Sequence, residues 1–101
     1  MSTGEPRSPQ EAAHGQANRA FDIDDVSGQT VVKCMGRTFS AVAVDDEVVI
    51  ADVTDITRPV SLGVARGRRA DGRWRIVGRH DQDLLTTASL LSAAVALWQE
   101  R

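Results

Sequence analysis

Residues 66–79 read RGRRADGRWRIVGR, and this order of residues predicts a β-hairpin. The dipeptide Asp71-Gly72 near its centre tolerates positive φ and suits a two-residue type I′ turn. With this dipeptide as the loop, Arg68 lies directly opposite Arg75 on the returning strand. The stretch therefore predicts two antiparallel strands, and the other strands of the chain can be placed around them.

The predicted hairpin has one basic face and one apolar face, because side chains alternate between the two faces of a strand. Trp74 and Ile76 belong to the apolar face. The basic face carries five arginines, which are Arg66, Arg68, Arg73, Arg75 and Arg79. Like charges directly opposite each other destabilise a sheet, so we interpret these arginines as the candidate binding site for an anionic partner.

Three aliphatic residues also fall on this basic face. In the same register, Leu62, Val64 and Val77 lie on the side of the arginines. We expect either that strand twist separates them from the charges or that another element covers part of this face. The alternative is a binding surface of mixed apolar and basic character.

Further strand patterns precede the hairpin at nearly regular spacing. β-branched or alternating residues predict strands over 30–35, 38–44, 47–53 and 60–67. Short turns are expected at 36–37 and 45–46, and we interpret residues 21–26 as a short strand or an ordered edge segment. Together with the second hairpin strand, this is an antiparallel β-meander of about five strands, typical of a small barrel or a strongly twisted sheet.

The C-terminal segment is expected to form a helix that packs on this sheet. Apolar residues recur at spacings of three and four and form one stripe, which consists of Leu84, Ala88, Leu91, Ala94, Val95 and Trp98. Asp81 or Asp83 can cap a helix that begins there. The alternative is a last strand over 84–87, followed by a shorter helix with Ser89 as its N-cap. The predicted fold class is therefore α+β.

The chain has 101 residues, of which 42% are hydrophobic and 26% charged, as expected for a single globular domain. We place this domain at 21–101. Residues 1–20 contain two prolines and no branched aliphatic or aromatic side chain. We therefore predict that they form a disordered tail that adds nothing to the core.

Charge is distributed unevenly along the sequence. Residues 22–57 contain eight acidic and two basic residues, a net charge of −6, whereas 66–80 contain six arginines and one aspartate, a net charge of +5. Such a molecule can bind a charged partner or associate with itself. Eleven of the twelve basic residues are arginine, which favours bidentate recognition of phosphate or carboxylate groups.

The sequence contains no recognisable catalytic, metal-binding or cofactor-binding pattern. His14, His80 and Cys34 are far apart along the chain, whereas a metal site needs clustered ligands. A single cysteine excludes an internal disulfide and favours a reducing cytoplasmic location. Residues 84–98 are too short and too polar to span a bilayer, and the first twenty residues lack the apolar run of a signal peptide. We therefore expect a cytoplasmic protein without enzyme activity, cofactor or membrane contact.

The arginine face leads to two functional hypotheses. The first is a binding module that contacts nucleic acid through its phosphates, largely independently of base sequence. The second is a protein interaction or assembly module, in which the arginines meet an acidic protein surface or the acidic part of a second copy in a homodimer. The acidic segment 22–57 opposes DNA binding unless it points away from the arginines.

Overall fold

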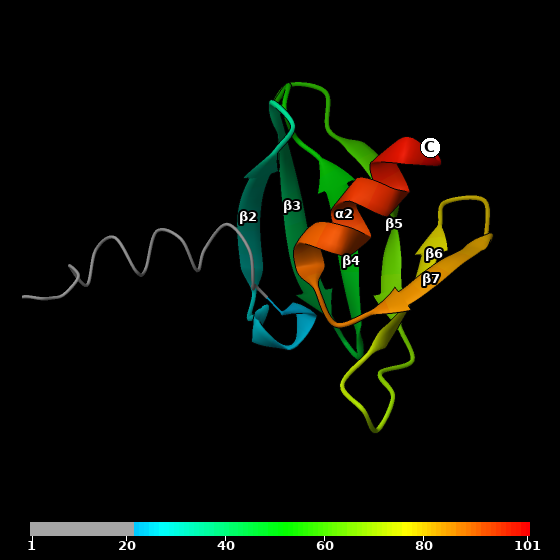
Figure 1. Ribbon diagram of the computed structural model, residues 1–101. Coiled ribbons are helices and arrows are strands. Elements are labelled where there is room, and N and C mark those ends of the chain that lie inside the picture. The colour runs from blue at the N-terminus through cyan, green and yellow to red at the C-terminus, as the bar shows by residue number, and fades with distance from the viewer. Residues whose placement is uncertain (1–21) are drawn as a thin grey trace, which may run out of the picture.

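The strands of this protein pair in the order in which they follow one another along the chain. The computed structural model describes residues 22–101, so the tail predicted over 1–20 and residue Phe21 lie outside the described residues. The elements are η1 (Ile23–Asp25), β2 (Gln29–Cys34), β3 (Arg37–Val44), β4 (Glu47–Asp52), β5 (Val60–Arg66), β6 (Trp74–Gly78), β7 (Asp83–Thr87) and α2 (Leu90–Gln99). All neighbouring strands are antiparallel. The predicted α+β meander with a C-terminal helix is confirmed, with six strands in place of about five (Figure 1).

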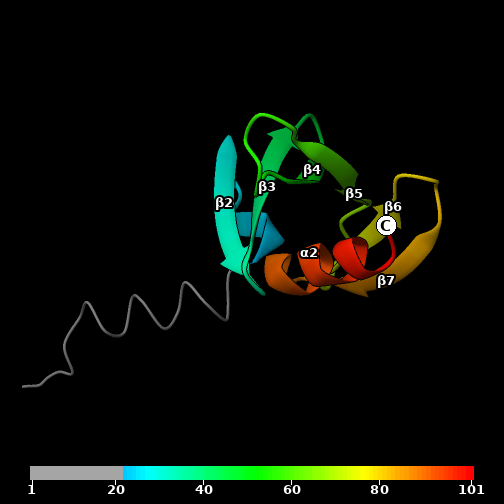
Figure 2. The same ribbon diagram turned by 90° about the horizontal axis from the view of Figure 1, so that it is seen from above.

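The sheet is strongly curled and does not close into a barrel. Figure 2 shows it bending from β2 round to β7, with α2 and η1 lying across the open side. Among the described residues, β2 and β7 are the two edge strands and do not pair with each other. The inner face of the sheet therefore packs on α2, and we call the opposite face, which points away from the helix, the outer face.

Two tight turns join the first three strands. The turn between β2 and β3 uses Met35 and Gly36, whose φ values of 57° and 70° are those of a type I′ turn. The predicted turn at 36–37 was wrong by one residue. The turn between β3 and β4 at Asp45 and Asp46 is confirmed, and Asp45 adopts a φ of 54° that aspartate tolerates better than most residues.

The C-terminal helix is shorter than the 84–98 segment favoured from the sequence. Residues 83–87 form β7, and α2 begins at Leu90 with Ser89 as its N-cap, whose side chain accepts a hydrogen bond of 3.1 Å from the backbone N–H of Ser92. Consecutive threonines at 86 and 87 favour a strand, and serine is a good cap. The alternative reading of this segment is thus confirmed, and a helix beginning at Asp81 or Asp83 is wrong.

The buried side of α2 differs from the predicted stripe by one position along the helix. The residues it buries are Leu90, Ala93, Ala94 and Leu97. Of the predicted stripe, only Ala94 belongs to this set, and Trp98 packs against the core while staying half-exposed. The wrong side of the helix was predicted to face the core, because the stripe included Leu84 and Ala88, which lie outside the helix.

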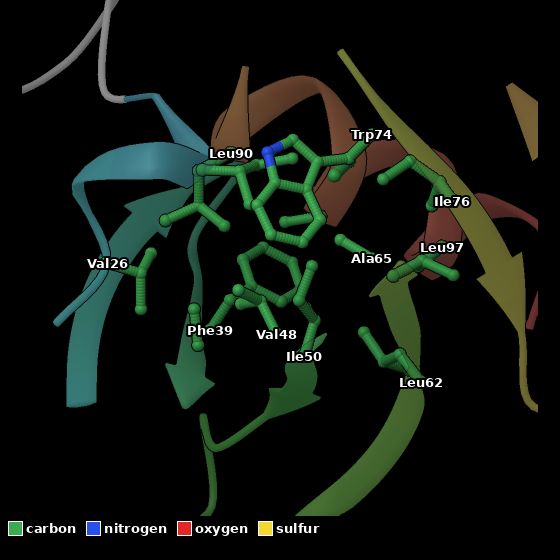
Figure 3. Packing of buried hydrophobic residues seen from close by; sticks show 14 residues of the cluster. Val26, Phe39, Val48, Ile50, Leu62, Ala65, Trp74, Ile76, Leu90 and Leu97 are labelled. Atoms are coloured by element: carbon green, nitrogen blue, oxygen red, sulfur yellow. The ribbon is translucent and has the colours of Figure 1, made fainter. Parts of the chain in front are cut away.

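The core fills the space between the inner face of the sheet and α2 (Figure 3). Phe39, Ile50 and Ile76 are completely shielded from solvent. Leu62 is 1% exposed and belongs to this core rather than to the arginine face. The register between β4 and β5 shifts at Ile50 and Ala51, so that one extra residue is inserted opposite them. This bulge turns Leu62 inward, which corrects the sequence-based placement.

The acidic segment before β2 is a helical turn rather than the strand or edge segment predicted over 21–26. Asp22 makes one isolated antiparallel bridge to Ser89, and residues 23–25 form the 3₁₀ helix η1. The backbone N–H of Ile23 donates to the carbonyl of Ala88 at 2.8 Å, and the Ile23 side chain is 1% exposed. One buried isoleucine therefore anchors η1 to the core and leaves its aspartates outside.

A partly buried ion pair joins β3, β4 and the end of α2. Arg37 donates from Nε and Nη2 to Asp52 Oδ2 at 2.9 and 2.8 Å, and its guanidinium lies 5.7 Å from the centre of the Trp98 ring. Thr54 donates to Asp52 Oδ1 from both its backbone N–H and its hydroxyl. Burial is the largest single influence and raises the pKa of Asp52, but the bonds from Thr54 and Arg37 outweigh it and lower this pKa below its ordinary value of 3.8.

The substitution Asp52→Asn is expected to lower the free energy of unfolding by about 1–2 kcal/mol at neutral pH, because Arg37 loses its anionic partner. The folded pKa lies below the unfolded value of 3.8, so the contribution of Asp52 is complete above the unfolded pKa and is lost as the pH falls through the folded pKa. Urea unfolding of the wild type and of Asp52→Asn at neutral and acidic pH measures this contribution. The difference in their free energies of unfolding should become smaller at acidic pH.

Asp55 provides a matched control for this variant. Its carboxylate accepts from the backbone N–H and the hydroxyl of Thr57 in the same pattern, but it is exposed and forms no ion pair with an arginine side chain within residues 22–101. Asp55→Asn is expected to change stability much less. Equal losses in the two variants would contradict a specific contribution from the pair of Arg37 and Asp52.

Candidate interaction surface

The arginine-rich hairpin has a longer connection than the sequence suggested. Arg66 pairs with Arg75, and β5 and β6 are joined by residues 67–73. At the tip, the N–H of Gly72 donates to the carbonyl of Arg69 at 2.9 Å, and Gly72 has a φ of 82°. This is a three-residue tip with its glycine in the left-handed region, so the predicted two-residue turn at Asp71-Gly72 was wrong.

The ladder nevertheless keeps the predicted faces, because its register differs from the expected one by two residues and the side-chain period is also two. Arg66 and Arg75 lie side by side on the outer face, whereas Trp74 and Ile76 are 8% and 0% exposed on the inner face. This part of the prediction is confirmed. The expected pairs of Arg68 with Arg75 and of Arg66 with Val77 do not form.

The other three predicted arginines do not join this row. Arg68 and Arg73 lie in the connection between the strands, and Arg73 donates from Nη2 to the carbonyl of Thr86 at 2.6 Å. Arg79 lies in the turn that follows β6, where its backbone N–H donates to the carbonyl of Leu62. The structure therefore places only Arg66 and Arg75 of the five on one continuous strand surface.

Carboxylates of the same chain accompany the arginines of the outer face. Arg66 Nε lies 3.2 Å from Glu47 Oε2, and Arg75 Nε lies 3.2 Å from Asp83 Oδ1. These side chains are between 37% and 69% exposed, so each pair stabilises the fold by only about 0–1 kcal/mol. Their larger effect is on the surface potential, because each arginine charge has an opposite charge beside it.

Asp24 holds the base of the connecting loop and was not predicted as a functional residue. Arg68 donates to its two carboxylate oxygens from Nε and Nη2 at 2.8 and 3.0 Å, and Trp74 Nε1 donates to Oδ1 at 2.9 Å. The bonds from Arg68 and then from Trp74 lower the pKa of Asp24. The expected burial of Trp74 is a sequence signal for such an acceptor, since a buried indole N–H usually needs a hydrogen-bond acceptor.

A cavity of about 550 Å³ lies beside Asp24 and Arg68, between η1, the turn after β3 and the β5–β6 connection. Trp74 and Ile23 form part of its apolar wall. Its charged lining consists of Asp24, Asp45, Asp46, Glu47 and Arg68. Four carboxylates against one guanidinium make the cavity unfavourable for phosphate, because like charges repel at these distances.

A row of valines crosses the outer face next to Arg66 and Arg75. Cross-strand pairing links its members from β3 to β6, and the valine row consists of Val42, Val49, Val64 and Val77. The first three are half-buried, whereas Val77 is 3% exposed and is not accessible at the surface. Val64 therefore lies at the surface beside Arg66, whereas Val77 is buried, and the binding surface of mixed apolar and basic character stays a prediction.

The described part of the chain shows no arrangement of metal ligands. Residues 22–101 contain no group of three or more histidine, cysteine, aspartate or glutamate side chains that could hold a metal ion. His80 is exposed in the turn after β6, and Cys34 is a half-buried thiol at the end of β2. Within the same residues, no helix has the length and apolar character needed to cross a membrane.

Comparisons with known proteins found no matching family model, no matching curated protein and no matching solved structure.

Proposed function

We propose that this protein is a non-enzymatic interaction module that binds a partner protein through the outer face of its sheet. The observation that carries the proposal is the half-buried part of the valine row, Val42, Val49 and Val64, which lies beside the paired charges of Arg66 and Arg75. Protein interfaces combine an apolar centre with a polar rim that contains arginine. Apolar side chains that lie next to one another at a protein surface are a common feature of interaction sites.

The charge arrangement favours a protein over a nucleic acid as the partner. Acidic residues of segment 22–57 do not point away from the arginines, because Asp24 binds Arg68 and Glu47 lies against Arg66. A phosphate that approached these arginines would meet the carboxylates as well. Nucleic-acid affinity depends on uncompensated cations that release counterions, and this surface offers few of them.

The partner that fits this face carries apolar side chains opposite the valine row and carboxylates opposite Arg75. Arg75 is the more accessible of the two arginines on the outer face, with 53% of its side chain exposed. Its single contact with Asp83 leaves guanidinium N–H groups that can donate to a second carboxylate. Affinity would come from the apolar contact, and orientation from the charged one.

The test compares variants of this face in the capture of a partner from a lysate of the source cells, followed by titration with the purified partner. Val64→Lys and Arg75→Glu are each expected to weaken binding by about tenfold or more, the cost of losing one important contact. Arg58→Glu is the matched control for charge, because Arg58 lies in the connection between β4 and β5, outside the valine row. Equal binding by all variants would overturn the proposal.

The nucleic-acid hypothesis stays a prediction, and the same proteins test it. Labelled duplex DNA is titrated at low salt with the wild type and with Arg75→Glu. Binding to DNA with a salt slope of about −0.9 per phosphate contact, lost in Arg75→Glu, would overturn the proposed protein partner and support a nucleic-acid module. We expect no binding at tens of micromolar protein.

A further inference from the structure

Strand β2 leaves one edge of the sheet without a neighbouring strand among the described residues. The two-residue turn after β2 makes Cys34 and Arg37 a hydrogen-bonded pair of the β2–β3 ladder. At the other end of this ladder, the carbonyl of Gly28 accepts a hydrogen bond from the backbone N–H of Ala43. Even-numbered residues of β2 therefore bond to β3. The backbone N–H and C=O groups of Gln29, Val31 and Lys33 point to the free edge.

This edge has few of the features that prevent sheets from pairing with each other. The strand β2 is six residues long and regular in register, contains no proline, and carries Lys33 as its one charged residue. Short, bulged or charged strands are the usual protection of an edge. The second edge strand differs from β2, because the register of its ladder shifts between Ile76 and Val77 and β7 therefore contains a bulge.

Apolar side chains accompany the free backbone groups. Val31 is 53% exposed on the outer face of β2, and Ile56, in the connection between β4 and β5, is 83% exposed. Both line a groove of about 510 Å³ together with Val53 and Pro59. A strand that paired with β2 would bring its own outer-face side chains next to Val31 and this groove.

We propose that β2 pairs with β2 of a second copy of this chain in an antiparallel arrangement, with a twofold axis between the two Val31 residues. Antiparallel pairing of identical strands is compatible with this symmetry, because each residue then meets its counterpart by the same operation. With Val31 opposite Val31, Gln29 lies opposite Lys33 of the second copy, and Lys33 opposite Gln29. This register avoids repulsion between like charges, since each lysine faces a neutral amide that can accept a hydrogen bond and no two lysines are opposed.

The same register satisfies the backbone groups at the edge. Residues 29, 31 and 33 point outward, and in this register each faces another outward-pointing residue, which gives about six interstrand hydrogen bonds. The two sheets become one continuous sheet, and the two Val31 side chains pack against each other beside the two grooves. This interface is the edge of β2, so it does not depend on the partner proposed for the valine row.

The experiment is sedimentation velocity of the full chain over a range of concentrations. The wild type is expected to be a dimer with a micromolar dissociation constant. Val31→Lys and Val31→Glu are each expected to be folded monomers, because like charges then meet at the axis. An equimolar mixture of these two variants should again form dimers, since opposite charges meet. Val44→Lys is the matched control, because Val44 is 48% exposed on β3, and it should dimerise as the wild type does.

A second measurement tests the register. In a protein that also carries Cys34→Ser, the variant Val31→Cys should form a disulfide-linked dimer on mild oxidation, because Cα atoms of a hydrogen-bonded antiparallel pair lie about 5.5 Å apart, within disulfide range. A wild type that stays monomeric at all concentrations would overturn the proposal. A Val44→Lys variant that loses the dimer would also overturn it, as would a mixture of the two charged variants that stays monomeric while each is folded by circular dichroism.

Discussion

The substitution Gly63→Ala is expected to lower the free energy of unfolding by about 3 kcal/mol, because the sheet has no room for one more carbon there. An added Cβ at Gly63 would lie 2.3 Å from the carbonyl oxygen of Val77 and 2.5 Å from Cδ2 of Leu97. The first of these atoms belongs to the backbone of the neighbouring strand, so relief of the clash requires β5 and β6 to separate. Urea unfolding monitored by tryptophan fluorescence measures the loss.

Gly78→Ala is the matched control, since Gly78 lies directly opposite Gly63 in the same ladder. An added Cβ at Gly78 would come within 2.5–2.7 Å of atoms at the end of the Gln82 side chain. This flexible side chain can move away at the cost of two exposed hydrogen bonds, which it accepts from the N–H of His80 and donates to the carbonyl of Glu100, so we expect a loss of about 1 kcal/mol. Similar losses in the two variants would show that side-chain crowding, and not the strand backbone, limits Gly63.

The strands and the fold class were predictable because their signals are local. The strand over 38–44 and the turn at 45–46 follow from β-branched residues beside two aspartates, and the structure confirms both within one residue at each boundary. The 84–87 segment shows the limit of such signals. Its leucines fit a helical stripe and a strand equally well, and the structure shows the strand, followed by a helix that begins after the capping Ser89.

The hairpin shows what local patterns leave open. The dipeptide Asp71-Gly72 forms part of a turn, as predicted, but the length of the loop depends on where the ladder ends. Gly67 has a φ of 65° at the end of β5, and Arg68 leaves the ladder to bind Asp24, which is 44 residues away in sequence. An interaction between residues so far apart in sequence leaves no periodic pattern. The sequence therefore predicts which side chains share a face of the hairpin, but not which residues of the two strands pair.

The same argument applies to the candidate site. The sequence identifies Arg66 and Arg75 as surface residues of one face, since alternation alone places them there. It does not identify their counterions, because Glu47 comes from another strand and Asp83 follows a turn. These carboxylates change the functional interpretation, since Arg66 and Arg75 each have an opposite charge beside them and no longer form a basic patch.

The substitution Leu97→Ala is expected to lower the free energy of unfolding by about 3 kcal/mol, the usual cost of removing a fully buried leucine side chain. Leu97 is 1% exposed and joins the last turn of α2 to the inner face of the sheet at Gly63. A domain of this size has a total stability of about 5–10 kcal/mol, so this loss is a large share of it. Thermal unfolding and urea unfolding of the variant should both shift strongly toward milder conditions.

Leu91→Ala is the control that makes this result a test of the helix phase. Leu91 belongs to the stripe predicted from the sequence, but it is half-exposed and lines a shallow groove on the far side of α2 with Ser92, Val95, Ala96 and Gln99. Because only part of its side chain leaves water on folding, we expect a loss of about 1 kcal/mol. A larger loss for Leu91→Ala than for Leu97→Ala would contradict the observed packing of α2. It would mean that the side of the helix that contains Leu91 is buried in solution. A dimer formed through that side of the helix would give the same result.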